Sequence, residues 1–384
     1  MRRQGAPVAV RRAAVLAYRA RAQGLVEPVP GWPDVLEVGV QDTPAGATAP
    51  VALRARRTGG GGPYASPDLA LVHSLRGTMH LHRAADLPLL AAALRPEAAA
   101  DLLTSVHGPF FLDRAARGQP VDALLDAVAA AMAEVMAAGG ARTKGELSSA
   151  VTALVAEPVA PWCPRCAARH VHDGLFRLAS LQAGLQLRPT GDGTARFLGP
   201  ARTGGAAATA ARATGPAQSR RELLRRFLRR HGPAEPASLA AWLGLTPTAA
   251  RRWWALLAPE VVEVTVAGQR RWCHAEELAA VRDAPPAPGV WLLPPYDPLL
   301  ELADRALLLP DPAARRQVWR AAANPGAVLA DAEIIGVWRQ RRTRGGAVLT
   351  VTAFGPLSPR HRRSLTATVE ALFGPEPPAV QFAP

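Results

Sequence analysis

The sequence has almost no lysine and little cysteine. Of its 45 basic residues, Lys144 is the single lysine and the others are arginines. Amine catalysis through a Schiff base would therefore have to use Lys144 or the N-terminal amine. The chain has three cysteines, two of them close together, which excludes a disulfide framework.

Long apolar runs are also absent. No stretch of about 18 uninterrupted apolar residues occurs, so we expect no transmembrane helix. Residues 1–24 carry arginines throughout and lack a continuous apolar segment, which argues against a secretory signal. These absences predict a cytoplasmic protein, associated with the nucleoid if its partner is DNA.

The composition does support folded domains and a polyanionic partner. The chain has 384 residues, of which 49% are apolar and 20% charged, so it can bury sizeable cores and is not disordered. Its 45 basic and 31 acidic residues give a formal net charge of +14. A positive field of this size favours nucleic acid or an anionic membrane surface over acidic proteins.

The order of predicted elements is clearest in residues 219–281. Apolar spacing and capping residues predict helices over residues 220–230, 237–243 and 247–257. Alternation over residues 261–272, interrupted at a glycine, predicts a β-hairpin. Three helices followed by a hairpin are typical of a winged helix-turn-helix.

Similar orders occur over residues 121–197 and, less regularly, 11–82, whereas short strands predominate after Pro285. We therefore predict a mainly helical α+β protein with tandem winged helix-turn-helix modules and a C-terminal small β-barrel or open sheet. The predicted divisions are a first module with a Gln-Asp-Thr loop (1–119), a second module (120–200), a linker (201–218), a third module (219–284) and a β-rich domain (285–384).

Four blocks, spread in order over nearly the whole chain, carry a family resemblance. They are Leu75-Arg-Gly-Thr-Met-His-Leu81 followed by Asp86-Leu87; His231-Gly-Pro233 with Ala241-Trp-Leu-Gly244; Leu293-Pro-Pro-Tyr-Asp-Pro298; and Asn324-Pro-Gly-Ala-Val-Leu329 leading to Ile335-Gly-Val-Trp-Arg339. In these blocks the chain resembles bacterial winged-helix DNA glycosylases of the AlkZ/YcaQ-like type. The resemblance implies a C-shaped, DNA-embracing body that repairs alkylation damage by hydrolysing the N-glycosidic bond of alkylated or crosslinked purines.

The resemblance also places the catalytic signature. In the family it reads Gln-x-Gln or Gln-x-Asp, on a loop after the first helices, and the matching place is Gly39-Val-Gln-Asp-Thr-Pro44. In one register Gln41 is the first motif position, Thr43 is the second, and Asp42 stands one residue early. In the other register Gln41 is the second position and Gly39 replaces the first. Neither register restores the full motif.

This departure bears directly on the chemistry. A glycosylase without a lysine nucleophile must position water against the anomeric carbon and stabilise oxocarbenium-like charge, which a carboxylate does best, an amide less well and a hydroxyl least. We expect Gln41 to contact the lesion or the water, and Asp42 or Thr43 to polarise that water. In an extended loop Asp42 points away from the face shared by the other two, although a turn at Pro44 would re-aim it.

Basic side chains on the predicted recognition helix and hairpin tips, and two histidines on the first predicted hairpin, are candidate DNA contacts. They would bind phosphates, although a solvated face explains the arginines and a structural role explains the histidines. Of the adjacent Trp253 and Trp254, we expect Trp254 in the core. The candidate DNA contacts are Arg76, His80, His82, Arg251, Arg252, Arg270, Arg271, Arg341 and Arg342.

Cys163, Cys166, His170 and His172 form a C-x2-C-x3-H-x-H pattern. Thiolates and imidazoles are the ligands that Zn²⁺ prefers, but four ligands this close in sequence must wrap one ion. The alternatives are a structural zinc site, or a cysteine pair in a loop with histidines that contact DNA. No cofactor is expected for the chemistry itself.

Two functions remain open from the sequence. One is a monofunctional DNA glycosylase, a hydrolase that acts on double-stranded DNA as a monomer and independently of metal. The other is a non-catalytic winged-helix DNA-binding protein, either a regulator or a lesion sensor.

Overall fold

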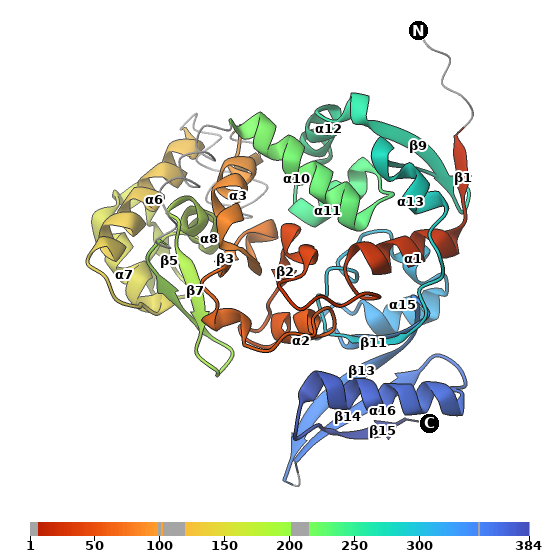
Figure 1. Ribbon diagram of the computed structural model, residues 1–384. Coiled ribbons are helices and arrows are strands. Elements are labelled where there is room, and N and C mark those ends of the chain that lie inside the picture. The colour runs from red at the N-terminus through yellow and green to blue at the C-terminus, as the bar shows by residue number, and fades with distance from the viewer. Residues whose placement is uncertain (1–6, 99–100, 103–119, 201–214, 345, 384) are drawn as a thin grey trace.

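The computed structural model describes residues 7–98, 101–102, 120–200, 215–344 and 346–383 (Figure 1). It has a mixed α+β architecture, which confirms the predicted class. Within the described residues no helix is both long enough and apolar enough to cross a bilayer.

The first large sheet combines strands from two of the predicted modules. Its order is β2-β4-β3-β7-β8, with every neighbouring pair antiparallel. The first three strands precede residue 84 and the last two follow residue 185, so the predicted division at residue 119 does not separate two sheets. The bounds are β2 (Val40–Gln41), β3 (Leu69–His73), β4 (Met79–Arg83), β7 (Gln186–Pro189) and β8 (Ala195–Leu198).

Helices surround this sheet and share its core. Local groups cap their ends: the hydroxyl of Thr143 accepts from the N–H of Glu146, while the Glu146 carboxylate accepts from the N–H of Thr143. Another helix stops just before Gly139. The helices are α2 (Ala49–Arg54), α3 (Leu87–Leu94), α6 (Val121–Ala137), α7 (Lys144–Leu154) and α8 (Asp173–Gln182).

The third unit shows the predicted order of three helices and a hairpin. Gly244, with φ of 72°, takes the left-handed conformation that ends the second helix. The first helix begins at Pro216, so the last residues of the predicted linker are helical; residues 201–214 lie outside the described part. The elements are α10 (Pro216–His231), α11 (Pro236–Leu243), α12 (Pro247–Ala255), β9 (Val261–Val266), β10 (Gln269–His274) and α13 (Leu278–Arg282).

The N-terminal segment joins this unit instead of its own predicted module. Strand β1 (Val8–Val10) pairs in parallel with β9, and α1 (Arg12–Ala22) contacts α10 and α13 (Figure 1). Parallel pairing of segments more than 250 residues apart leaves no local signal in the sequence.

The C-terminal domain is an open sheet, the second of the two predicted alternatives. Its order is β11-β12-β13-β14-β15, with α16 (Pro359–Phe373) over one face (Figure 1). Side chains alternate between faces along each strand: Leu292 packs with the α16 core, whereas Leu293 belongs to the core that contains α1. The other elements are β11 (Val290–Leu293), α14 (Arg305–Leu308), α15 (Pro312–Val318), β12 (Gly326–Ala330), β13 (Glu333–Thr343), β14 (Gly346–Ala353) and β15 (Ala379–Phe382).

Two fully buried ion pairs connect the N-terminal region to the start of the C-terminal domain. Arg19 Nη2 lies 2.6 Å from Asp304, and Arg56 Nη1 lies 2.8 Å from Asp297. Each guanidinium also donates to backbone carbonyl oxygens, as a buried charge requires. The predicted divisions therefore describe the order of elements along the chain and do not delimit separate cores.

Candidate active site

A cavity of about 1010 Å³ lies where the β2-β4-β3-β7-β8 sheet, α11 and residues 296–305 meet. Gln41 and Thr43 line it, together with side chains from β3, α8 and the loop between β7 and β8. Several segments distant in sequence thus build one hollow around the predicted motif. Its volume is at the upper end of the range typical of small-molecule pockets.

Gln41 lies in the wall of this cavity with a fixed amide. It is opposite His80 in the β2–β4 pair and only 5% exposed. Its Oε1 accepts from Nη2 of Arg76 at 2.9 Å, and its Nε2 donates to Oγ1 of Thr43 at 3.2 Å. Because arginine only donates, this contact also settles which amide atom is the oxygen.

A carboxylate that the sequence analysis missed shares this contact. Nη2 of Arg76 also lies 2.5 Å from Oε1 of Glu301, whose side chain is 5% exposed, and Nε2 of His80 lies 3.8 Å from the same oxygen. Burial alone would raise the pKa of Glu301, but the Arg76 charge and His80 outweigh it, so this pKa lies below its usual value. Glu301 is therefore an ionised carboxylate in the cavity wall.

The signal for Glu301 in the sequence was weak. It stands three residues after Pro298 in the Tyr-Asp-Pro block, and 260 residues after Gln41, so spacing could not pair the two. Its guanidinium partner comes from a strained turn: Arg76 has φ of 55°, in the left-handed region, and its Nη1 donates to the carbonyl of Trp242. Three distant segments meet at this one guanidinium.

Asp42 points away from the cavity and holds the loop ahead of α2. Its carboxylate accepts from the N–H groups of Gly46 (2.5 Å), Thr48 (3.0 Å) and Ala49 (3.1 Å), and from the hydroxyl of Tyr64 (2.8 Å). The residue is 0% exposed. Burial, and next the Asp42 charge, raise the pKa of Tyr64, which keeps it a hydrogen donor. This corrects the expectation that Asp42 polarises water: the loop turns it inward.

The surroundings of Gly39 leave no room for a larger side chain at this position. Its φ is +79°, and a Cβ built on it would lie 2.4 Å from Cε1 of His82. That imidazole is buried and donates to or accepts from Oγ of Ser74 at 2.9 Å. If position 39 is the first motif position, the His82 ring therefore occupies the space that a glutamine side chain would need there. If Gln41 is the first, Thr43 is the second and lines the cavity beside it. In both registers Gln41 is the one motif amide.

Three of the predicted DNA contacts are buried in the fold, and a fourth lines the cavity. His80 and His82 are 0% and 1% exposed, and burial lowers the pKa of His82 to about 3, so the prediction that they face DNA is wrong. Arg271 is also buried, with its Nη1 3.7 Å from Asp304. Arg76 reaches the cavity instead of the outer surface. Alternation along β4 places His80 and His82 on the same face of the strand, but it does not show that other elements cover this face.

The remaining candidates are exposed but do not form one patch. They lie on α12 (Arg251 and Arg252), β10 (Arg270) and β13 (Arg341 and Arg342). In Figure 1, α12 is at the opposite end of the molecule from β13. Arg252 also pairs with Asp101, and Arg270 pairs with Glu263.

On α12 the tryptophan assignment is reversed. Trp253 is 4% exposed and lies in the core, while Trp254 is half-buried. The reason is the helical phase that the surrounding elements impose, which the two adjacent residues alone do not reveal.

Other basic side chains do gather at the cavity. Lys144, Arg177 and Arg305 line it from α7, α8 and α14. Asp173 pairs with the first two, and Arg177 Nη2 lies 2.9 Å from it. These residues belong to three segments without a shared motif, so nothing in the sequence indicates that they lie together.

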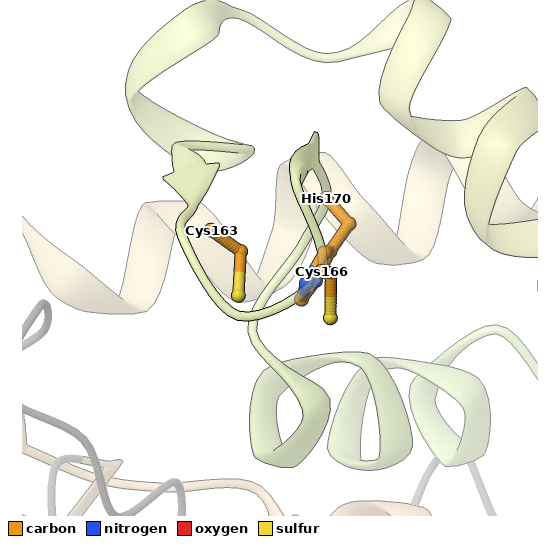
Figure 2. Close-up of side chains that lie close together, drawn as sticks. All are labelled: Cys163, Cys166 and His170. Carbon is orange, nitrogen blue, oxygen red and sulfur yellow. The ribbon is translucent and has the colours of Figure 1, made fainter.

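Of the predicted zinc ligands, the structure brings three together. One ligand atom each from Cys163, Cys166 and His170 lie within 4.8 Å of one another (Figure 2). His172 instead caps α8, where its Nδ1 accepts from the N–H of Gly174 at 3.3 Å.

Comparison with known proteins identifies the family. The family model described as DNA glycosylase AlkZ-like matches residues 38–374. The chain belongs to the AlkZ-like DNA glycosylase family. This confirms the resemblance drawn from the four sequence blocks.

A solved structure shows the same fold as this AlkZ-like chain. Streptomyces sahachiroi DNA glycosylase AlkZ superimposes with a TM-score of 0.75 at 20% identity, over 98% of this chain and 100% of that chain. A search of curated proteins found no match.

Proposed function

We propose that this AlkZ-like protein is a monofunctional DNA glycosylase that hydrolyses the N-glycosidic bond of an alkylated or crosslinked purine in double-stranded DNA. Family membership supports the reaction class. The cavity supports the manner of binding, since enzymes of this kind extrude the target nucleotide from the duplex into a pocket.

The observation that carries the proposal is the cluster of Gln41, Arg76 and Glu301 in the cavity wall. Hydrolysis develops positive charge on the sugar, and a fixed negative charge in a water-poor site stabilises such a transition state. Glu301 takes this role in the proposal. Because its pKa is lowered, it acts through its charge and by orienting water more than by removing a proton.

Gln41 then positions the attacking water or the lesion. Its amide is oriented by Arg76 on one side and Thr43 on the other, so little reorganisation is needed when substrate enters. Arg76 orients both the Gln41 amide and the Glu301 carboxylate, and its positive charge partly offsets the negative charge of Glu301. Asp42 is a positioning residue in this proposal, since it holds the loop that presents Gln41.

We assign DNA binding to the tandem winged-helix modules, of which residues 216–274 have the expected order of elements. The side chains of Lys144, Arg177 and Arg305 provide positive charge at the cavity itself. The net charge of +14 supports a polyanionic partner.

The test is release of free base from a methylated or nitrogen-mustard-treated duplex. Wild type should release base, and Gln41→Ala should release it more slowly while still binding the duplex. Full activity in Gln41→Ala would dismiss the site assignment, and no release by wild type over a panel of alkylated duplexes would dismiss the reaction.

One observation favours a second function, a lesion sensor or regulator without catalysis. His82 blocks the place of a side chain at position 39, so the motif holds a single amide. Both functions predict DNA binding with strong salt dependence, so binding assays do not separate them. Base release does.

A further inference from the structure

The short hairpin between α7 and α8 has little apolar packing, and Arg169 ties it to the chain before it through the Ala160 carbonyl and Glu157. Strands β5 (Trp162–Cys163) and β6 (Ala168–Arg169) have two residues each, and residues 164–169 are mostly exposed. The Trp162 side chain is 61% exposed and supplies no core. A two-stranded hairpin of this size is not stable in water by itself. Something other than apolar packing must stabilise it.

The hairpin places two thiols beside an imidazole. Cys163 is the last residue of β5, Cys166 lies in the turn, and His170 follows β6, so that their ligand atoms lie within 4.8 Å of one another (Figure 2). Ligand atoms around one tetrahedral zinc ion are about 3.3–3.8 Å apart, given Zn–S and Zn–N bonds of about 2.3 and 2.0 Å. Small side-chain rotations therefore close the site.

His170 has the hydrogen-bond pattern of a metal ligand. Its Nδ1 lies 2.8 Å from the carbonyl oxygen of Val171, which can only accept, so Nδ1 carries the proton in the neutral ring. Nε2 then carries the lone pair; it is buried and lies beside the Cys163 sulfur. A zinc-bound histidine typically donates its other ring N–H to a carbonyl in this way.

We propose that Cys163, Cys166 and His170 bind one Zn²⁺ ion, with water as the fourth ligand. Two thiolates and an imidazole are a soft donor set that suits zinc over magnesium or calcium. His172 is not a ligand, because it caps α8.

The ion is a structural clamp and takes no part in the reaction. His170 is followed closely by Asp173, the carboxylate that pairs with Lys144 and Arg177 in the cavity lining. Fixing the hairpin against the start of α8 thereby fixes two of the basic side chains that line the cavity.

Metal analysis of the full-length protein, purified without chelator and dialysed against Zn²⁺-containing and then metal-free buffer, tests this. Wild type should retain one zinc per chain. Cys166→Ser and His170→Ala should each retain less than a tenth of that, and His172→Ala, the matched control, should retain all of it. Replacing zinc by Co²⁺ should give wild type a thiolate-to-cobalt absorption band that His172→Ala keeps.

Wild type without retained zinc, or without the cobalt band, would overturn the proposal. A loss in His172→Ala equal to that in His170→Ala would overturn the ligand set. The wild-type measurements do not depend on any variant folding, and none of these readouts depends on glycosylase activity, so this proposal fails or stands separately from the proposed function.

Discussion

The two buried carboxylates near the motif have opposite predicted roles, and isosteric amides can separate them. In Glu301→Gln the side chain keeps its size and an acceptor for Arg76, which also keeps its bonds to Gln41 and Trp242. We expect the free energy of unfolding to fall by only about 1–2 kcal/mol, because the hydrogen bond to Arg76 remains but loses its charge assistance. The negative charge in the cavity wall is lost, and the rate of base release should fall about 10²–10³-fold, as for removal of one preorganised electrostatic contact.

Asp42→Asn should show the reverse. The asparagine oxygen can still accept from the N–H groups of Thr48 and Ala49, but its NH₂ group then faces the N–H of Gly46, which is left without an acceptor. An unsatisfied buried donor costs about 1–3 kcal/mol, and the remaining bonds lose their charge assistance. We expect a loss of about 2–4 kcal/mol in the free energy of unfolding. At low temperature, where the variant stays folded, base release should be near the wild-type rate.

Single-turnover base release from a methylated duplex gives the rates, and urea denaturation gives the stabilities. The reasoning is refuted if Asp42→Asn is as stable as wild type yet inactive while Glu301→Gln keeps its rate. That result would mean that Asp42 turns toward the substrate in the complex.

Three further outcomes follow. Burial lowers the pKa of His82 and His231 to about 3. Below about pH 6.5 both histidines bind protons in the unfolded chain but not in the folded protein. The free energy of unfolding should therefore fall by about 1.4 kcal/mol per pH unit for each histidine as the pH drops from about 6.5 toward 3. Urea midpoints at pH 7 and pH 5 measure this, and equal midpoints would contradict it. Arg56→Met should destabilise by about 3–5 kcal/mol because it leaves the Asp297 carboxylate buried and unpaired; thermal unfolding with Asp297→Asn added should recover part of the loss, and no recovery would argue against the pair. Gly39→Ala should cost about 2–4 kcal/mol from the positive φ and the approach to His82, and unchanged stability would show that this imidazole moves freely.

Local chemistry determined where individual helices and hairpins begin and end. The capping box at Thr143, the left-handed Gly244, and the three helices and hairpin of residues 216–274 each depend on residues a few positions apart. The family was also recognised from short blocks, which the match over residues 38–374 confirms.

The candidate site was predicted only in part. Gln41 was found by its motif, and it does line a cavity. Glu301 was missed because no periodicity connects it to Gln41 over 260 residues, and Asp42 was misassigned because the direction of its carboxylate depends on the turn that follows it. Likewise, His80 alternates correctly along β4, but only the elements packed on that face decide that it is buried.

The sequence by itself thus determined the secondary elements, the basic character and the family of this protein, because these follow from composition and from interactions between near neighbours. Only the tertiary structure decided that β1 joins β9, that two predicted modules share one sheet, and that an arginine at position 76 connects Gln41 to Glu301. The physical reason is that such contacts arise when distant segments are buried together, and burial depends on the whole chain and not on any one stretch of it.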